Sequence, residues 1–220
     1  MFLVMRLDRD LLSAEAERKL FHIAWAIDPL LYYFGYPRDG MLLLIGCQLL
    51  IWIGFEAARG MGYSAFSTSY MRPEEARGAP MGTLFQVASL FLAVLLFDKS
   101  IAIIAMVFNC VGDSAVGLAG AVLYPYIGRE KAAIREQGVR GLWNMLKSHK
   151  APVLMAVMFL ACVVPGFILF PRASPLLMGV GALGAVIADA FAWKLFGYTL
   201  NDDLTITLAA GSAMAIAASF

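Results

Sequence analysis

Long apolar stretches dominate the chain, and charged residues interrupt them at intervals. The hydrocarbon core of a bilayer is about 30 Å thick and takes about 20 residues of helix to cross. Seven stretches approach that length: Leu20–Phe34, Met41–Phe55, Gly82–Phe97, Ile101–Leu123, Ala151–Phe170, Ser174–Trp193 and Leu204–Phe220. The pattern therefore predicts an all-α, polytopic integral membrane protein with about seven transmembrane helices.

The first stretch is the shortest and is interrupted by Asp28-Pro29. Broken helices are tolerated in a membrane only where protein or water satisfies the freed backbone groups. This stretch is therefore expected to be either a short span or a re-entrant segment. Residues 1–17 mix apolar and charged side chains, which predicts an interfacial amphipathic helix. Residues 18–220 follow as a single transmembrane domain with a basic loop at 124–150.

Composition narrows the class of protein further. Of the 220 residues, 61% are hydrophobic and 15% are charged, whereas soluble domains average about 45–50% and about 25%. The mean hydropathy is +0.76 and the formal net charge is +1. These values exclude a disordered chain and a basic nucleic-acid-binding arm, so we expect membrane lipids as partners and no nucleic acid.

The distribution of basic residues predicts the orientation. Cytoplasmic loops of membrane proteins are enriched in Lys and Arg. With seven spans, 14 of the 17 basic residues fall on the side of the amino terminus and 3 on the other side. The amino terminus and the loop at 124–150 are therefore predicted to be cytoplasmic, with the carboxyl terminus on the opposite side. If the first stretch is re-entrant, only the amino terminus changes side.

Three carboxylates in or beside the predicted spans need a reason, because Asp costs about 2.5–3.5 kcal/mol in the middle of a transmembrane helix. They are Asp113 in the fourth stretch, Asp189 in the sixth, and Glu56 at the cytoplasmic end of the second. Asn109 lies four residues before Asp113 and shares its helical face. A hydrogen-bonded packing cluster would explain the asparagine, but the costlier carboxylate of Asp113 favours a function. At Asp28 a packing role and a functional role are about equally favoured.

Asp113 lies ten residues before Leu123. A continuous helix would place it about 15 Å from that end at 1.5 Å per residue. We therefore expect either that the fourth helix ends early, near Gly117–Gly120, or that an aqueous cleft reaches Asp113.

The predicted cytoplasmic side also collects other charged residues: Arg18, Lys19, His22, Glu56, Arg59, Arg129, Lys147, Asp202 and Asp203. Basic residues there are ordinarily explained by attraction to anionic lipid. Carboxylates beside them are not, and they suit a site where Mg²⁺ bridges phosphate groups while Lys and Arg neutralise the remaining charge. Phosphoryl transfer requires little beyond such positioning and charge stabilisation.

Five short elements then occur in a fixed order: Arg18-Lys19-x-x-His22; Glu56-x-x-Arg59; Arg77-Gly78 followed by Gly82-Thr83; Gly112-Asp113-Ser114-Ala115 with Gly120 and Gly128-Arg129; and Asp202-Asp203-Leu204-Thr205-Ile206. In order and spacing they resemble the CTP-dependent polyprenol and lipid kinases, the family of dolichol kinase, phytol kinase and the CTP-using diacylglycerol kinase.

The chain departs from the family pattern at four positions. The family's K-S-x-x-G segment is here Lys147-Ser148-His149-Lys150-Ala151, without the glycine. Asp189 stands where the family usually has Glu, Asp203 where it has Asn, and Thr207 where it has Pro. These departures leave the nucleotide preference and the substrate open.

The resemblance implies that the chain transfers the γ-phosphoryl group of CTP, rather than ATP, to the hydroxyl group of a polyprenol, a phytol-like isoprenoid or diacylglycerol. It implies Mg²⁺ or another divalent metal ion as cofactor. The implied catalytic residues are Asp113 and Lys19; the nucleotide ligands are Arg18, Lys19, Gly112, Arg129 and Lys147; the metal ligands are Asp113, Asp202, Asp203 and Glu56; and the orienting residues are His22, Arg59, Asn109 and Asp189.

Alternatives remain at this point. A phosphatidate cytidylyltransferase would need the same metal and basic groups but would release pyrophosphate. The alternatives that are not lipid enzymes are a transporter and a non-enzymatic scaffold on the same fold. The glycine pairs Gly117-x-x-Gly120 and Gly181-x-x-Gly184 could pack helices within one chain or between two, so a homo-oligomer also remains open.

Overall fold

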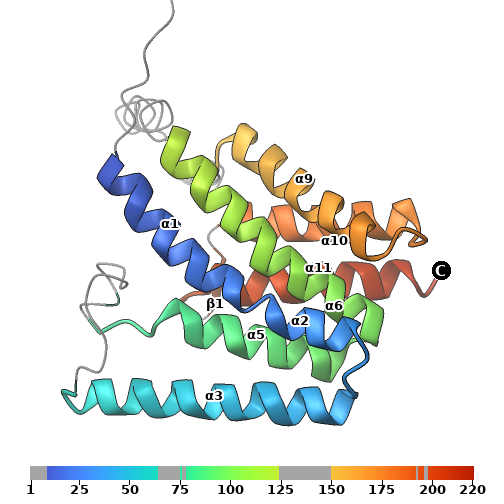
Figure 1. Cartoon of the computed structure of the whole chain (residues 1–220). Coiled ribbons are helices and arrows are strands. Elements are labelled where there is room, and N and C mark those ends of the chain that lie inside the picture. Colours follow the sequence, from blue (N-terminus) through green and yellow to red (C-terminus); the bar gives the residue numbers. More distant parts are fainter. Residues whose placement is uncertain (1–8, 64–74, 76–77, 124–149, 192, 196–197) are drawn as a thin grey trace, which may run out of the picture.

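The computed structural model describes residues 9–63, 75, 78–123, 150–191, 193–195 and 198–220. The helices are α1 (Arg9–Ala24), α2 (Ile27–Tyr33), α3 (Arg38–Gly60), α5 (Gly82–Leu96), α6 (Lys99–Val107), the π-helix η2 (Phe108–Asp113), α9 (Pro152–Leu169), α10 (Pro175–Ala190) and α11 (Asp202–Ala217) (Figure 1). A two-residue antiparallel ladder pairs β1 (Lys194–Leu195) with β2 (Tyr198–Thr199). The all-α prediction is confirmed.

Among the described residues, three helices are long and apolar enough to cross a membrane: Arg38–Gly60, Lys99–Leu123 and Pro152–Leu169. Two further apolar helices, α5 and α10, have 15 and 16 residues, which cover about 22–24 Å at 1.5 Å per residue. The structure therefore supports a membrane protein with three helices of full spanning length, and the count of seven spans stays a prediction.

The first predicted stretch is broken, but not where the sequence predicted. Helix α1 runs without interruption to Ala24, across the boundary between the predicted interfacial segment and the rest of the chain. The break lies at Trp25 and Ala26, and Asp28-Pro29 belongs to the first turn of α2. Proline is tolerated in a first turn because the N–H that it lacks would have no partner inside the helix.

Helices α3 and α5 form an antiparallel pair that is tied at both ends. At one end the guanidinium of Arg38 donates to the carbonyls of Val94 (3.1 Å) and Leu95 (2.8 Å). At the other end the backbone N–H of Met81 donates to Oε1 of Glu56 at 2.6 Å. This pair lies at one edge of the bundle (Figure 1).

The helix Lys99–Leu123, which comprises α6, η2 and residues 114–123, occupies the centre of the bundle (Figure 1). Every residue from 101 to 110 is buried, and α1, α2, α5, α9, α10 and α11 all contact this helix. The expectation that it ends near Gly117–Gly120 is wrong, because it continues to Leu123.

The glycine pairs face neighbouring helices of the same chain. A Cβ atom at Gly184 would lie 2.8 Å from the carbonyl oxygen of Ala209, and one at Gly181 would lie 2.6 Å from Cγ of Met214. Helices α10 and α11 therefore approach each other closely through Gly181-x-x-Gly184. A Cβ at Gly117 would overlap the side chain of Lys19 from α1.

Candidate functional site

The π-helix η2 lies in the middle of the central helix and contains Asn109, Gly112 and Asp113. A π-helix is rare and often marks a functional site, because its wider turn changes the backbone hydrogen bonds and the direction of side chains. Side chains contact three carbonyls of this segment. The hydroxyl of Ser114 donates to the carbonyl of Cys110 at 2.7 Å, and Cys162 Sγ approaches that of Phe108 at 3.9 Å. Nε2 of His22 lies 3.4 Å from the carbonyl of Asn109.

Gly112 faces α9. A Cβ atom there would lie 2.8 Å from Sδ of Met158 and 2.9 Å from Sγ of Cys162. The absence of a side chain therefore lets α9 pack directly against η2. This contact gives Gly112 a packing role on the α9 side, and the structure does not test the nucleotide contact that the family resemblance implies.

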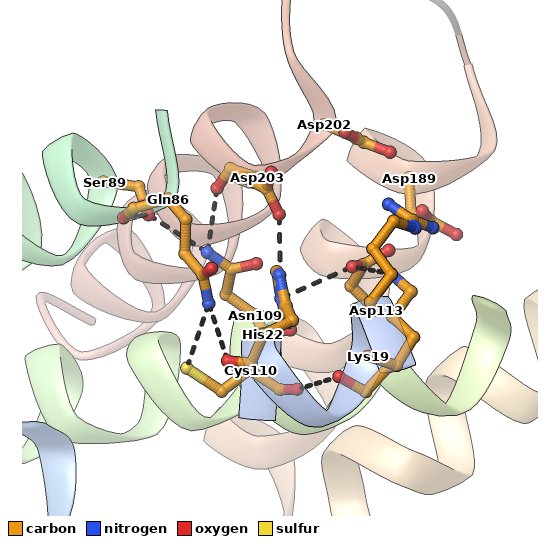
Figure 2. A network of polar contacts seen from close by, with 12 residues as sticks. Lys19, His22, Gln86, Ser89, Asn109, Cys110, Asp113, Asp189, Asp202 and Asp203 are labelled. Carbon is orange, nitrogen blue, oxygen red and sulfur yellow. Dashed lines mark hydrogen bonds and ion pairs between the residues drawn. The ribbon is translucent and has the colours of Figure 1, made fainter. Parts of the chain in front are cut away.

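Asp113 forms a buried ion pair with Lys19, which reaches it from α1 (Figure 2). The two residues are 94 positions apart in the sequence, and both are buried. The stem of Lys19 passes Gly117, where any larger residue would overlap it. Gly117 therefore provides the space through which the ammonium reaches the carboxylate.

The imidazole of His22, one turn after Lys19, lies between two carboxylates. Its Nε2 is 3.4 Å from Oδ2 of Asp113 and 3.7 Å from Oδ1 of Asp203. Asp203 stands in the first turn of α11, where Oδ1 of the N-cap residue Asn201 accepts its backbone N–H at 2.9 Å. This cap holds the start of α11 against the central helix.

A layer of amide and hydroxyl groups lies beside these charges (Figure 2). Nδ2 of Asn109 donates to Oγ of Ser89 at 3.0 Å and to the carbonyl of Asp203 at 3.1 Å. The hydroxyl of Thr207 donates to the same Ser89 oxygen at 3.1 Å. Gln86 donates to the carbonyl of His22 at 3.0 Å. These bonds join α1, α5, α11 and the central helix at one level.

Asp189, near the end of α10, forms an ion pair with Lys150. The backbone N–H of Lys150 also donates to the carbonyl of Ala190 at 3.0 Å, so the start of α9 is tied to the end of α10. Burial lowers the pKa of Lys150, but the carboxylates of Asp189, Asp113 and Asp202 together raise it above its ordinary value. The ammonium therefore stays charged at neutral pH.

Within the part of the chain that the structure describes, two groups of side chains have the geometry to hold a metal ion, and they share Asp113. One group is His22, Asp113 and Asp203, and the other is Asp113, Asp189 and Asp202. Within each group one ligand atom from every residue lies within 4.8 Å of the others. Carboxylates from η2, α10 and α11 thus meet at one place, although the sequence separates them by up to 90 residues.

Glu56 and Arg59 form an ion pair at 2.6 Å, three residues apart at the end of α3. The guanidinium of Arg59 also donates to the carbonyls of Glu75 and Ala79, both at 2.6 Å. Because Oε1 of Glu56 accepts the N–H of Met81, the pair fastens the chain that enters α5. Glu56 belongs to neither metal-ligand group among the described residues.

The start of α5 connects this ion pair to the central site. The N–H of Gly82 donates to Oε1 of Glu75 at 2.8 Å. A Cβ atom at Gly82 would lie 3.4 Å from that oxygen and 3.6 Å from Oδ2 of Asp203. Gly82 therefore lies beside the carboxylate of Asp203, and a bulky residue in its place would press on the metal-ligand group.

The remaining predicted nucleotide ligands are Arg18, Arg129 and Lys147. Arg18 pairs with Glu15 on α1, at 2.5 Å. Arg129 and Lys147, which the resemblance assigned to the nucleotide, lie outside the described residues. The roles of all these residues in binding stay predictions.

Sequence reasoning missed four residues of the site: Lys150, Gln86, Ser89 and Thr207. Gln86 and Ser89 did leave a signal, because they are polar, lie three residues apart and stand inside an apolar stretch. Thr207 registered only as a departure from the family pattern, and Lys150 only as one basic residue of a loop. Nothing in the sequence pointed to Asp189 as the partner of Lys150, since the two are 39 residues apart.

Comparison of the chain with protein-family models, with curated proteins and with solved structures yields no match.

Proposed function

We propose that the chain is a membrane-embedded kinase that transfers the γ-phosphoryl group of CTP to the hydroxyl group of a lipid alcohol. One observation carries the proposal. Three of the elements that resemble the CTP-dependent lipid kinases meet at one buried site: Lys19 and His22 from the first, Asp113 from the fourth, and Asp202-Asp203 from the last. Packing of apolar helices alone does not require charged side chains from three distant segments to converge.

The residues at this site fit a divalent cation. Asp113, Asp189 and Asp202 offer carboxylate oxygens within 4.8 Å of one another, and oxygen ligands are what Mg²⁺ prefers. These three carboxylates would hold the ion. When bound, Mg²⁺ would neutralise charge on the phosphates of the nucleotide and on the transferred group.

The chain's own groups then have distinct tasks. The ammonium of Lys19 supplies positive charge to the phosphates. A carboxylate oxygen of Asp113 accepts the proton of the alcohol as the alcohol oxygen bonds to the γ-phosphorus. The bond from that phosphorus to the bridging oxygen breaks, which leaves a lipid phosphate and CDP. Burial of the ion pair excludes water, which would otherwise compete with the alcohol.

We also propose that the chain crosses the membrane seven times, with the site at the cytoplasmic face. The end of α3 meets the start of α5, and the start of α9 meets the end of α10, near the polar site. Arg38 and Lys99, predicted for the opposite side, meet the far ends of α5 and α2: Arg38 binds carbonyls of α5, and Nζ of Lys99 lies 5.0 Å from the ring centre of Tyr32. This alternation agrees with the distribution of basic residues.

Purified protein in mixed micelles tests the activity, with γ-labelled CTP or ATP, Mg²⁺, and diacylglycerol, phytol, geranylgeraniol or dolichol as acceptor. We expect label from CTP in a lipid phosphate, with CDP as the other product. Asp113→Asn should lower the rate at least about 100-fold, as expected when a positioned acid–base group is lost. Asp98→Asn is the matched control, because Asp98 is exposed just before α6 begins.

Other results of this transfer assay would change the proposal in specific ways. Transfer from ATP alone would show that the altered Lys147–Ala151 segment has changed the donor. Release of pyrophosphate with phosphatidate as acceptor would replace the kinase with a cytidylyltransferase. No product from a folded protein with any of these acceptors would contradict the proposed function.

A further inference from the structure

The contacts of His22 are too long for a hydrogen bond of ordinary strength. Its Nε2 lies 3.4 Å from Oδ2 of Asp113, 3.7 Å from Oδ1 of Asp203 and 3.4 Å from the carbonyl oxygen of Asn109. N–H···O bonds in proteins measure about 2.7–3.2 Å. One ring nitrogen thus faces three oxygen atoms at distances that leave room between them.

These separations are close to those between neighbouring ligands of a metal ion. Ligands about 2.1 Å from an octahedral ion lie about 3.0 Å apart. Ligands at a similar distance from a tetrahedral ion lie about 3.4 Å apart. The separation of 3.4 Å between Nε2 of His22 and Oδ2 of Asp113 exceeds the octahedral value by about 0.4 Å and matches the tetrahedral one.

Asn109 supplies an independent observation that points to a ligand. Its side chain is fully buried, and its Oδ1 has no hydrogen-bond partner among the described residues. Because Nδ2 donates to Ser89 and to the carbonyl of Asp203, the orientation of the amide is determined. Its oxygen is therefore turned away from Ser89, and Figure 2 shows it on the side of His22. Buried carbonyl oxygens are rarely left without a partner.

We propose that His22, Asp113 and Asp203, together with the amide oxygen of Asn109, form a second metal site that takes a first-row divalent ion such as Mn²⁺. An imidazole nitrogen among oxygen ligands favours such an ion over Mg²⁺. This inference deepens the proposed function and rests on it, since the site adjoins the carboxylates assigned to Mg²⁺. Asp113 belongs to both groups, so the two sites share this residue.

Occupation of this site changes the role of Lys19. Its ammonium is paired with Oδ2 of Asp113, the same oxygen that faces His22. A divalent ion replaces the ammonium as the counter-charge of Asp113. Lys19 is then released toward the phosphates of the nucleotide, so metal binding and nucleotide binding are coupled through one side chain.

The test uses full-length protein in micelles, stripped of metal with a chelator and titrated with Mn²⁺ alone. Electron paramagnetic resonance counts bound Mn²⁺, and electron spin echo modulation detects a nitrogen ligand. We expect bound Mn²⁺ with ¹⁴N modulation from an imidazole. His22→Gln should abolish this modulation and weaken binding at this site more than about 100-fold, beyond the 10- to 100-fold typical of outer-shell changes.

Two further variants separate a ligand from a merely structural residue. Asn109→Ala should weaken Mn²⁺ binding about 10-fold while the nitrogen modulation stays. Thr207→Val, the matched control, removes a hydroxyl of the same hydrogen-bonded layer but no ligand. It should change neither the affinity nor the modulation.

The wild-type spectrum decides the outcome even if a variant fails to fold. Bound Mn²⁺ without nitrogen modulation, or no bound Mn²⁺, would overturn the second site. Phosphoryl transfer from CTP with Mg²⁺ could still be measured in that case, so the proposed kinase activity would stand without the second metal site. Nitrogen-ligated Mn²⁺ in a protein that phosphorylates no alcohol would instead overturn the kinase and leave the metal site.

Discussion

The helices Arg38–Gly60 and Lys99–Leu123 each contain an 18-residue window with a mean hydropathy of 1.9, but the structure buries 17% of that window in the first helix and 78% in the second. The first lies at the edge of the bundle and the second at its centre (Figure 1). Large apolar side chains such as Leu43 and Leu50 are 70% and 68% exposed on the first helix. Windows of equal hydropathy therefore lie in two environments, an exposed edge and a buried centre.

Polar and small residues distinguish the two helices. The central helix contains Asn109 and Asp113, whose partners come from α1, α5 and α11. Its Gly112 lies against α9, whereas nothing lies within 4 Å of a Cβ atom placed on Gly54 of α3. In a membrane, apolar surface alone does not drive helices together, so close packing and interhelical hydrogen bonds determine which helix becomes central.

Lys19→Met, which acts on the central helix, should cause the largest loss of stability. It leaves the carboxylate of Asp113 buried without its ammonium, and loss of one partner from a buried pair costs about 3–5 kcal/mol. Unfolding of the metal-free protein in micelles, followed by circular dichroism, measures the loss. The double variant Lys19→Met/Asp113→Leu should recover most of it. Equal instability of both variants would mean that Lys19 acts through packing rather than through its charge.

Gly112→Ala and Gly54→Ala compare the same substitution in the two environments. At Gly112 the new Cβ would lie 2.8 Å from Sδ of Met158, and such overpacking costs about 1–3 kcal/mol. At Gly54 the methyl group meets no neighbour, and helix propensity predicts a gain of up to about 1 kcal/mol. The same unfolding assay gives both values, and a loss at Gly54 as large as that at Gly112 would remove the contrast.

Ile104→Val and Leu50→Ala should have the smallest effects on stability. The smaller truncation, at Ile104, should cost more than the larger one, at Leu50. Ile104 is 1% exposed in the central helix, so removal of one methylene should cost about 0.5–1.5 kcal/mol. Leu50 loses three carbons but is 68% exposed, so the change should stay within about 0.5 kcal/mol. A greater loss at Leu50 than at Ile104 would indicate that α3 is covered by protein, for instance in an oligomer, rather than by lipid.

The sequence predicted the helical elements well but placed some of their limits wrongly. Apolar length indicated α3, α5, α9, α10 and α11, because a bilayer requires continuous apolar helix. It misplaced the break in the first stretch, since proline is as compatible with a first turn as with an interruption. Of the two alternatives that it predicted for the central helix, an early end or an aqueous cleft that reaches Asp113, the early end is wrong. That reasoning did not include Lys19, which reaches the carboxylate from α1.

At the site, short motifs identified the charged residues but not their partners. Lys19, His22, Asp113, Asp202 and Asp203 stood out by type and spacing. The amides and hydroxyls that orient them, Gln86, Ser89 and Thr207, belong to ordinary apolar stretches in the sequence. The pairing of Lys150 with Asp189 depends on how α9 and α10 meet, which no local pattern records.

The sequence by itself determined that this protein is helical, apolar enough for a membrane and equipped with costly carboxylates, because these properties depend on composition and on distances along the chain. The tertiary structure alone decided which of two apolar helices is central, that Phe108–Asp113 form the π-helix η2, and that Asp113 lies beside Lys19, His22 and three other aspartates. The physical reason is that those outcomes depend on shape and on charge neutralisation between distant segments, where the fit of one glycine or the reach of one lysine determines what can meet.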